Sequence, residues 1–225
     1  MSNEILRQAT IFSGLDEAAA DSVESSMKTT KLNRGETLFN EGDEGTELFV
    51  VLDGKIKLGH SASDGRETLL AVLGPGQMFG ELSLFDPGPR SATATAVVNT
   101  QVASLSHDAL LPIIAAHPDV SRALLFQLAT RLRRTNEVVG DLVFSDVPGR
   151  VAKALVDLAN RFGKKTDKGI DVNHDLTQEE LAQLVGASRE TVNKALADFV
   201  HRGWIQLEPR SVQIYDLERL EHRSR

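Results

Sequence analysis

Residues 79–93 hold the densest group of side chains that could do binding chemistry. Gly80 permits a ligand to approach the backbone closely, and Glu81 offers two acceptors that suit a sugar hydroxyl. Further on, Arg90 offers a planar fork of donors that matches a phosphate, and Ser91 adds a hydroxyl and a backbone N–H. Taken singly, an arginine and a glutamate around a Pro-Gly loop usually make a surface salt bridge.

Residues 177–200 predict two helices joined by a tight turn. Thr177 and Glu180 form a capping box, in which each side chain accepts from the other residue's backbone N–H. Gly186 allows the left-handed conformation that the turn needs, and Ser188 caps the second helix. The spacing is that of a helix-turn-helix, although any αα-hairpin could share this outline.

The first exposed turn of the second helix favours DNA reading. In a helix-turn-helix, that turn meets base edges in the major groove, where arginine pairs with guanine and glutamate accepts from cytosine. The charged or polar residues there are Arg189, Glu190, Asn193 and Lys194. A solvated structural face would use the same residue types. Residues 204–214 predict a hairpin that forms the wing of a winged helix, with Arg210 at its tip available for phosphate.

Composition narrows the classes of protein. The 225 residues include no cysteine, which excludes disulfides, thiolate nucleophiles and cysteine-bound zinc or iron–sulfur clusters. The six histidines are scattered, so no metal site is expected. The net charge of −7 comes entirely from residues 1–145, whereas residues 146–225 are neutral and can approach phosphate. No apolar run approaches the roughly 20 residues of a membrane span, and no secretory signal is present, so a cytoplasmic protein without membrane contact is expected.

The pattern of apolar residues and glycines predicts the helices and strands that would position these residues. Residues 30–106 show short apolar runs punctuated by glycine, which predicts an antiparallel roll or barrel. Asp53-Gly54 between two such runs predicts a hairpin, and residues 94–98 and 101–105 predict two more strands. The preceding residues, 3–27, predict one or two helices packed on the barrel.

A long helix is predicted after His117-Pro118, because apolar or small residues recur at intervals of three and four. These residues are Leu125, Leu128, Leu132, Thr135, Val139 and Leu142. The pattern fits either a core helix or a dimer seam, and the arginines at 131, 133 and 134 favour the exposed seam. Residues 146–149 should break the helix at Pro148, and we place an interdomain hinge there. A further helix is expected over 150–162, followed by a loop over 163–169.

The 79–93 segment resembles the phosphate-binding cassette of cyclic-nucleotide-binding domains. Together with Val185-Gly186 and the sequence from Ser188 to Val192, correctly ordered around a long helix, it identifies the chain as similar to the cyclic AMP receptor protein/FNR family. The sequence as a whole is most similar to actinobacterial cyclic-AMP-responsive global regulators. The resemblance covers nearly the whole chain, from about residue 11 to 214.

The resemblance implies an α+β fold in three parts. Residues 1–117 would form an antiparallel, jelly-roll-like cyclic-nucleotide-binding β-roll, 118–145 a dimerisation helix, and 146–225 a winged helix-turn-helix. Cyclic AMP would be the allosteric effector. Partners would be palindromic double-stranded operator DNA, a second copy of the chain, and RNA polymerase. Whether the protein activates or represses, and whether it prefers cyclic AMP to cyclic GMP, stays open.

The same resemblance implies roles for individual residues. Gly80 and Glu81 would hold the ribose, and Arg90 with Ser91 the cyclic phosphate. Thr135 would bind the adenine amino group of its own subunit's ligand, and Asn136 would reach the ligand of the other subunit. The expected cyclic-AMP-binding residues are Leu58, Leu70, Ala71, Gly80, Glu81, Leu82, Arg90, Ser91, Thr135 and Asn136. The expected DNA-binding residues are Thr177, Gln178, Ser188, Arg189, Glu190, Thr191, Asn193, Lys194 and Arg210.

Three other classes are weaker. A cyclic-nucleotide module for a partner enzyme would leave the helix-turn-helix without a purpose. A sensor of haem-bound gas could use His60 or His107, but the set of Glu81, Arg90 and Ser91 argues against it. An enzyme is the weakest candidate, because no catalytic triad order, metal cluster or nucleotide-hydrolysis motif occurs.

Overall fold

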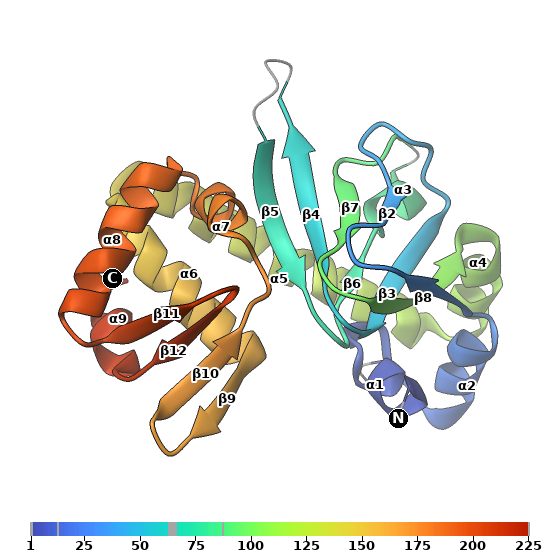
Figure 1. Cartoon of the computed structure of the whole chain (residues 1–225). Coiled ribbons are helices and arrows are strands. Elements are labelled where there is room, and N and C mark those ends of the chain that lie inside the picture. The colour runs from blue at the N-terminus through green and yellow to red at the C-terminus, as the bar shows by residue number, and fades with distance from the viewer. Residues whose placement is uncertain (1, 13, 63–66, 87, 225) are drawn as a thin grey trace. The chain divides into compact units, whose positions relative to one another are not determined.

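A computed structural model describes residues 2–12, 14–62, 67–86 and 88–224. The contacts divide the chain into two compact units (Figure 1). The first comprises residues 1–66 and 70–134, and the second comprises residues 67–69 and 135–225. The contact boundary therefore falls inside the long helix, and the two units are described separately below.

The first unit is an antiparallel β-roll, and its N-terminal helices share a hydrophobic core with the helices that follow the roll. Its elements in chain order are α1 (Ser2–Gln8), a 3₁₀ turn (Thr10–Phe12), α2 (Glu17–Ser25), β1 (Lys28–Leu32), β2 (Thr37–Phe39), β3 (Glu47–Asp53), β4 (Ile56–Ser61), β5 (Glu67–Leu73), β6 (Met78–Phe79), α3 (Leu82–Phe85), β7 (Thr93–Ala96), β8 (Thr100–Ser106), α4 (His107–Ala116) and the start of α5 (Pro118–Phe144). The strands form two sheets, ordered β1-β8-β3-β6 and β2-β7-β4-β5. The predicted α+β roll and long helix are thus confirmed.

Strand β3 separates two hydrophobic cores. Because side chains alternate along a strand, Leu48 and Val50 face the core that the N-terminal helices and α4 close, whereas Phe49 and Val51 face the core between the sheets. All four are buried. This double burial explains the continuous apolar run at residues 48–52, which a strand exposed on one face would not have.

The predicted Asp53-Gly54 hairpin is wrong in its strand pairing. Strand β3 pairs with β8 and β6, whereas β4 pairs with β7 in the other sheet. The turn itself is present, since Gly54 has φ +83°, and a Cβ there would lie 2.5 Å from the carbonyl oxygen of Asn99. The Thr100 hydroxyl hydrogen-bonds to the backbone N–H and carbonyl of Lys55 and so holds the connection between β3 and β4 in place. A turn signal specifies the reversal of the chain, but long-range packing selects the partner strand.

Helix α5 begins at Pro118, as predicted, and is 27 residues long. Only its first turns contribute to the core, through Val120, Ala123 and Leu124. Beyond them, most of the large apolar seam residues are exposed, with Leu125 65% and Leu132 63% exposed, whereas Leu128 is half-buried. Among the described residues, no single helix could cross a membrane by length and hydropathy. Helices α4 and α5 would qualify only as a pair, and they are bent by 118° at their junction.

The second unit is a winged helix-turn-helix with one core of its own. Beyond the end of α5, its elements are α6 (Val147–Phe162), β9 (Gly163–Thr166), β10 (Gly169–Asn173), α7 (Gln178–Val185), α8 (Arg189–His201), β11 (Ile205–Glu208), β12 (Ser211–Ile214) and α9 (Leu217–Arg223). The strands form one sheet, ordered β11-β12-β10-β9. Strands β11 and β12 are the predicted wing hairpin.

The local features predicted for the helix-turn-helix are confirmed. Both hydrogen bonds of the Thr177–Glu180 capping box are present. Gly186 has φ +69°, and the Ser188 side chain accepts from the N–H of Thr191 at the start of α8. The buried residues of α8 are those expected, namely Val192, Ala195, Leu196 and Phe199.

Two sequence predictions in this unit are corrected. Helix α6 begins at Val147 and not at residue 150, because Pro148 lies in the first turn, where a missing N–H costs no helical hydrogen bond. Residues 163–169, predicted as a loop, form β9 and a turn that pairs β9 with β10. All four residues of β9 are exposed. Lysines at 164 and 165 suit an exposed edge strand, and this polar strand shows no hydrophobic alternation to reveal it.

Asp146 caps α6 and should contribute stability that depends on pH. Its carboxylate accepts from the N–H of Gly149 at 2.9 Å and pairs with Arg223 at 2.6 Å. These hydrogen bonds, with Arg223 the larger cause, hold the pKa of Asp146 below its ordinary value. The stabilisation is therefore complete above the aspartate pKa of about 3.9 and is lost as the pH falls through the lower folded-state value.

We expect Asp146→Ala to lower the free energy of unfolding of the second unit by about 1 kcal/mol, mainly through the lost cap. Asp146→Asn keeps the acceptor and should lose less, because solvent screens the exposed pair with Arg223. Fluorescence of Trp204, the single tryptophan, reports unfolding of this unit. The gap between parent and Asp146→Asn should stay constant from pH 7 to pH 5 and narrow below about pH 4. A gap that widens on acidification would contradict this account.

Candidate ligand and nucleic-acid sites

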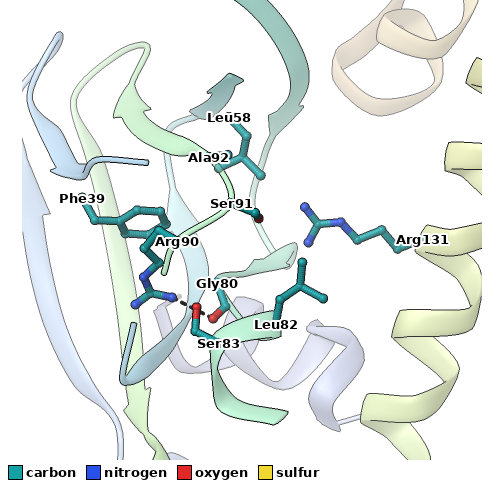
Figure 2. Close-up of a pocket in the computed structure, with 9 residues that line it drawn as sticks. All are labelled: Phe39, Leu58, Gly80, Leu82, Ser83, Arg90, Ser91, Ala92 and Arg131. Atoms are coloured by element: carbon teal, nitrogen blue, oxygen red, sulfur yellow. Dashed lines mark hydrogen bonds between the residues drawn. The ribbon is translucent and has the colours of Figure 1, made fainter. Parts of the chain in front are cut away.

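A recess in the first unit is lined by half of the ten residues predicted to bind the ligand. Figure 2 shows Arg90 and Gly80 on one side of the recess and Arg131, from α5, on the other. The complete lining is Phe39, Leu58, Gly80, Leu82, Ser83, Arg90, Ser91, Ala92 and Arg131. Five of these were expected from the sequence, and four were not.

Arg90 is a buried cation with few partners. Its side chain is stacked on Phe39, with the guanidinium carbon 4.3 Å from the ring centroid, and the residue is 6% exposed. One nitrogen donates to the carbonyl oxygen of Gly80 at 2.8 Å, as Figure 2 shows, whereas the buried Nε has no hydrogen-bond partner among the described residues. No carboxylate described in the structure forms an ion pair with it. An anion would complement this group.

The pKa of Arg90 reflects the same surroundings. Burial lowers it, and the carboxylates of Glu47, Asp43 and Glu81 partly oppose that effect. Arginine nevertheless stays protonated in proteins, so the positive charge is retained at a desolvation cost. Binding a negatively charged ligand at this point would offset part of that cost.

Glycine is required at two positions beside Arg90. Gly80 has φ +77°, and a Cβ there would lie 2.8 Å from an Arg90 nitrogen. At Gly45, a Cβ would lie 2.3 Å from the Ser83 hydroxyl and 2.9 Å from Arg90 Nε. The backbone of the same loop holds the arginine, since the N–H of Arg90 donates to the carbonyl of Asp43.

Glu81 is the second buried charge of the site and is 1% exposed. It adjoins the lining residues Gly80 and Leu82 but is not itself part of the lining. One of its oxygens accepts from Arg131 at 2.7 Å. The other oxygen is buried and has no hydrogen-bond partner within the described chain. A buried acceptor without a donor is unfavourable, so a ligand hydroxyl would satisfy it.

Some of the residues predicted for the ligand site line the recess, and others lie outside its lining. Of the apolar residues expected in the pocket, Leu58 lines the recess, but Leu70, which is 53% exposed, and Ala71 do not. The predicted Thr135 and Asn136 follow Arg131 by about one helical turn on α5, at the start of the second unit. Ser83 and Ala92 adjoin predicted residues and could have been found by proximity. Phe39 could not, because only the tertiary fold brings β2 to Arg90.

The candidate DNA-reading surface is the exposed N-terminal turn of α8. Arg189, Glu190 and Lys194 are exposed there, and Lys194 pairs with Glu190 at 2.6 Å, one helical turn apart. Thr191 is also exposed and shares a 2.8 Å hydrogen bond with the capping Ser188. These side chains share one end of α8, as the helix-turn-helix prediction requires.

Asn193 and Gln178 connect the two helices of the motif. The amide nitrogen of Asn193 donates to Gln178 Oε1 at 3.3 Å, whereas Asn193 Oδ1 is buried and has no hydrogen-bond partner among the described residues. Gln178 is the first residue of α7 and is exposed. The side chain of Asn193 is therefore directed at α7, although it lies in the turn that was expected to face DNA.

The wing is fixed by two residues in the left-handed region. Arg210, at the tip, has φ +65°, and Asp175, in the loop before α7, has φ +63°. The N–H of Asp175 donates to the carbonyl of Arg210 at 2.8 Å, and the Arg210 guanidinium reaches the carbonyl of Asp175 at 3.4 Å. The exposed Arg210 thus sits on a tip that is tied to the reading motif.

Arg150 fastens the end of α5 to the helix-turn-helix. Its guanidinium donates to the carbonyls of Ser145 at 2.8 Å, Val185 at 3.1 Å and Gly186 at 3.3 Å. Lys153 adds an ion pair with Asp141 of α5 at 2.5 Å. The last turns of α5 are therefore attached to the second unit.

Comparison with known families agrees with both sites. Residues 29–117 match the model of the cyclic nucleotide-binding domain, and residues 149–223 match that of the Crp-like helix-turn-helix domain. These two ranges contain the recess-lining residues except Arg131, and the whole of α7 and α8.

Similar proteins extend over nearly the full chain. The chain is 54% identical over 223 residues to the CRP-like cAMP-activated global transcriptional regulator of Mycobacterium tuberculosis (strain H37Rv), covering 99% of this chain and 100% of that protein. It is 34% identical over 216 residues to the cyclic AMP receptor protein of Thermus thermophilus, covering 96% and 97%. The solved structure of the Thermus thermophilus catabolite activator protein matches with a TM-score of 0.56 and 34% identity, covering 96% of this chain and 98% of that one.

A cyclic nucleotide-binding domain followed by a Crp-like helix-turn-helix defines a class of two-domain transcriptional regulators. The chain belongs to the cyclic AMP receptor protein (CRP) family within that class.

Proposed function

We propose that the protein is a cyclic-AMP-responsive transcriptional regulator that binds DNA as a homodimer. The observation that carries this proposal is a pair of incompletely satisfied buried charges, Arg90 in the lining of the recess and Glu81 next to the lining residues Gly80 and Leu82 in the sequence. Arg90 presents a desolvated cation, and Glu81 presents an acceptor that lacks a donor. A cyclic nucleotide offers the matching groups in one molecule, a singly charged phosphate and a ribose hydroxyl.

The roles proposed for the recess follow from these contacts. Arg90, with the Ser91 hydroxyl and N–H, binds the cyclic phosphate, and Gly80 and Glu81 bind the ribose. Leu58 and Leu82 supply apolar contact, and Leu70 and Ala71 remain proposed, by resemblance to the family, for the apolar part of the pocket. Thr135 and Asn136 are proposed for the adenine, by resemblance to the family. The relatives named cAMP-activated support cyclic AMP as the effector.

Assembly as a homodimer is supported by the apolar face of α5. Beyond the first turns, the exposed large apolar residues of this helix are Leu125, Phe126, Leu132, Val138, Val139, Leu142, Val143 and Phe144. Phe144 is 88% exposed, which is unusual for a phenylalanine of a stable monomer. The heptad spacing within this set suits the same helix of a second copy.

The DNA role rests on the second unit. Thr177 and Gln178 lie at the start of α7, near the proposed phosphate contacts, and Ser188 and Thr191 cap α8. Arg189, Glu190 and Lys194 are proposed to read bases, and Arg210 to bind phosphate. A two-fold dimer places two reading helices on the halves of a palindrome, about 34–36 Å apart. RNA polymerase is the proposed further partner.

We keep the proposed domains as 1–117, 118–145 and 146–225, for the cyclic-nucleotide-binding domain, the dimerisation helix and the DNA-binding domain. A haem sensor is disfavoured by the surroundings of the two candidate histidines. His60 pairs with Glu41 at 2.7 Å, His107 lies 3.7 Å from Asp108, and neither lines the recess.

The function is tested by cooperative binding. A duplex selected from a random pool by the protein with cyclic AMP should bind more tightly at saturating cyclic AMP than without it, by about 5- to 150-fold. By linkage, the same duplex should tighten cyclic AMP binding by the same factor in calorimetry. Equal affinity of the duplex with and without cyclic AMP would reject the proposal.

Thr135→Leu should weaken this coupling. Thr135 is the one polar position in the α5 seam, so leucine there should preserve the dimer while removing the proposed contact with the base. We expect the ratio of operator affinities at saturating and zero cyclic AMP to shrink, with basal binding changed less. Thr130→Leu, on the same helix but outside the seam, is the matched control. If both variants keep the parent ratio, Thr135 does not connect the sites.

A further inference from the structure

We infer that Asn193 is a positioning residue that acts on DNA through Gln178 and not by reading a base. The inference rests on the proposed DNA-binding function and concerns how the two helices of the motif share one contact. It starts from the hydrogen bond between Asn193 Nδ2 and Gln178 Oε1, at 3.3 Å.

The orientation of Asn193 is unsuited to base recognition. An asparagine that recognises adenine uses its oxygen and its amide nitrogen together, in a bidentate contact. In this structure Asn193 Oδ1 is buried and has no hydrogen-bond partner among the described residues, and the nitrogen is used on α7. The neighbouring residues Glu190 and Lys194, by contrast, are about three-quarters exposed in their side chains.

The same hydrogen bond orients Gln178. Because Oε1 accepts from Asn193, the amide NH₂ of Gln178 is directed away from that contact, on an exposed side chain at the first position of α7. An outward NH₂ donates to a phosphate oxygen, whereas an outward amide oxygen would be repelled by one. Asn193 thereby selects the amide orientation that favours DNA.

The test is a double-mutant cycle in the full-length protein at saturating cyclic AMP. The proteins are the parent, Asn193→Ala, Gln178→Ala and the double variant. The probes are the duplex selected from a random pool and a scrambled duplex, measured by fluorescence anisotropy over a salt range of roughly 50 to 200 mM. We expect each single variant to bind both duplexes about tenfold more weakly per half-site, because a hydrogen bond to a charged group is removed at each half-site. The double variant should be no weaker than Gln178→Ala.

Two readouts separate positioning from a structural role. The salt dependence of binding should match the parent in the alanine variants, because no cation is removed from the interface. The Asn193→Asp variant, which can only accept, should turn the Gln178 amide and weaken binding more than Asn193→Ala does. In the Gln178→Ala background, the difference between the Asn193→Asp and Asn193→Ala substitutions should shrink to the cost of the added charge.

Additive losses in the cycle would overturn the inference, as would a loss confined to the selected duplex at one base pair, which would make Asn193 a base reader. Parent-like binding by Asn193→Ala would also overturn it. If the parent itself fails to select a duplex with cyclic AMP, the proposed function fails instead, which is a separate result.

Discussion

Arg90→Leu should abolish measurable binding of cyclic AMP in a calorimetric titration. Removing one partner of a buried, hydrogen-bonded charge pair costs about 2–5 kcal/mol or more, which corresponds to roughly 30-fold to several thousand-fold in affinity. Arg90 meets the condition of burial, because it is 6% exposed and is stacked on Phe39. The ligand phosphate would supply the anion that the described residues do not.

The stability of this variant should change little. The buried guanidinium carries a desolvation cost, which leucine removes, whereas the carbonyl of Gly80 loses a donor, which costs about 1 kcal/mol. Arg90→Lys should bind with intermediate affinity, since it keeps the charge but not the planar fork. Arg122→Leu, which removes an exposed arginine of α5 paired with Asp119, is the matched control and should bind like the parent. A normal titration by Arg90→Leu would show that the ligand site lies elsewhere.

The second large effect is expected on DNA. Arg189→Ala should lose about 1–3 kcal/mol per half-site on the selected duplex, and the loss should centre on one base pair. The residue is exposed at the first position of α8, so its removal should not change folding. Arg189→Lys should recover the contribution of the charge without the bidentate geometry. Arg202→Ala, at the other end of α8, is the control for general loss of charge.

Arg210 provides the contrasting case in the same assay. Replacing it should weaken selected and random duplexes alike and reduce the salt slope by about one for each phosphate that the wing no longer neutralises. Alanine is the appropriate replacement, because the parent arginine already holds φ at +65° with a Cβ, so alanine removes the charge without changing the backbone strain, whereas glycine would relieve it. If Arg189→Ala weakens selected and random duplexes equally, its assignment as a base reader is wrong.

Local chemistry was readable from the sequence, and long-range pairing was not. The capping box at Thr177 and the left-handed Gly186 depend on residues within a few positions of each other, so their prediction succeeded. The partner of β3 depends on packing on both faces of that strand, so the residues around Gly54 predict the turn but not the strand pairing. Strand β9 has no alternation of apolar and polar residues, so its glycine and lysines predict a loop and not a strand.

The candidate ligand site shows the same division. One segment contains Gly80, Glu81, Arg90 and Ser91, and these residue types suit a phosphate and a sugar hydroxyl. Phe39 and Arg131 reach the recess from β2 and α5, far away in the sequence. The sequence pattern assigns Arg131 to an exposed basic face, yet it pairs with the most deeply buried carboxylate of the site. Such a pair is visible only when the helix has been placed against the roll.

Arg150 links the C-terminal ends of α5 and α7 through its hydrogen bonds. The carbonyls of Ser145, Val185 and Gly186 stand at the C-terminal ends of α5 and α7, where the partial negative charge of each helix is concentrated. One guanidinium neutralises both ends, so neither can fray without releasing the other. The terminal amides of α5 and α7 should therefore exchange their hydrogens as one cooperative group, although Ser145 and Val185 lie 40 positions apart in the sequence.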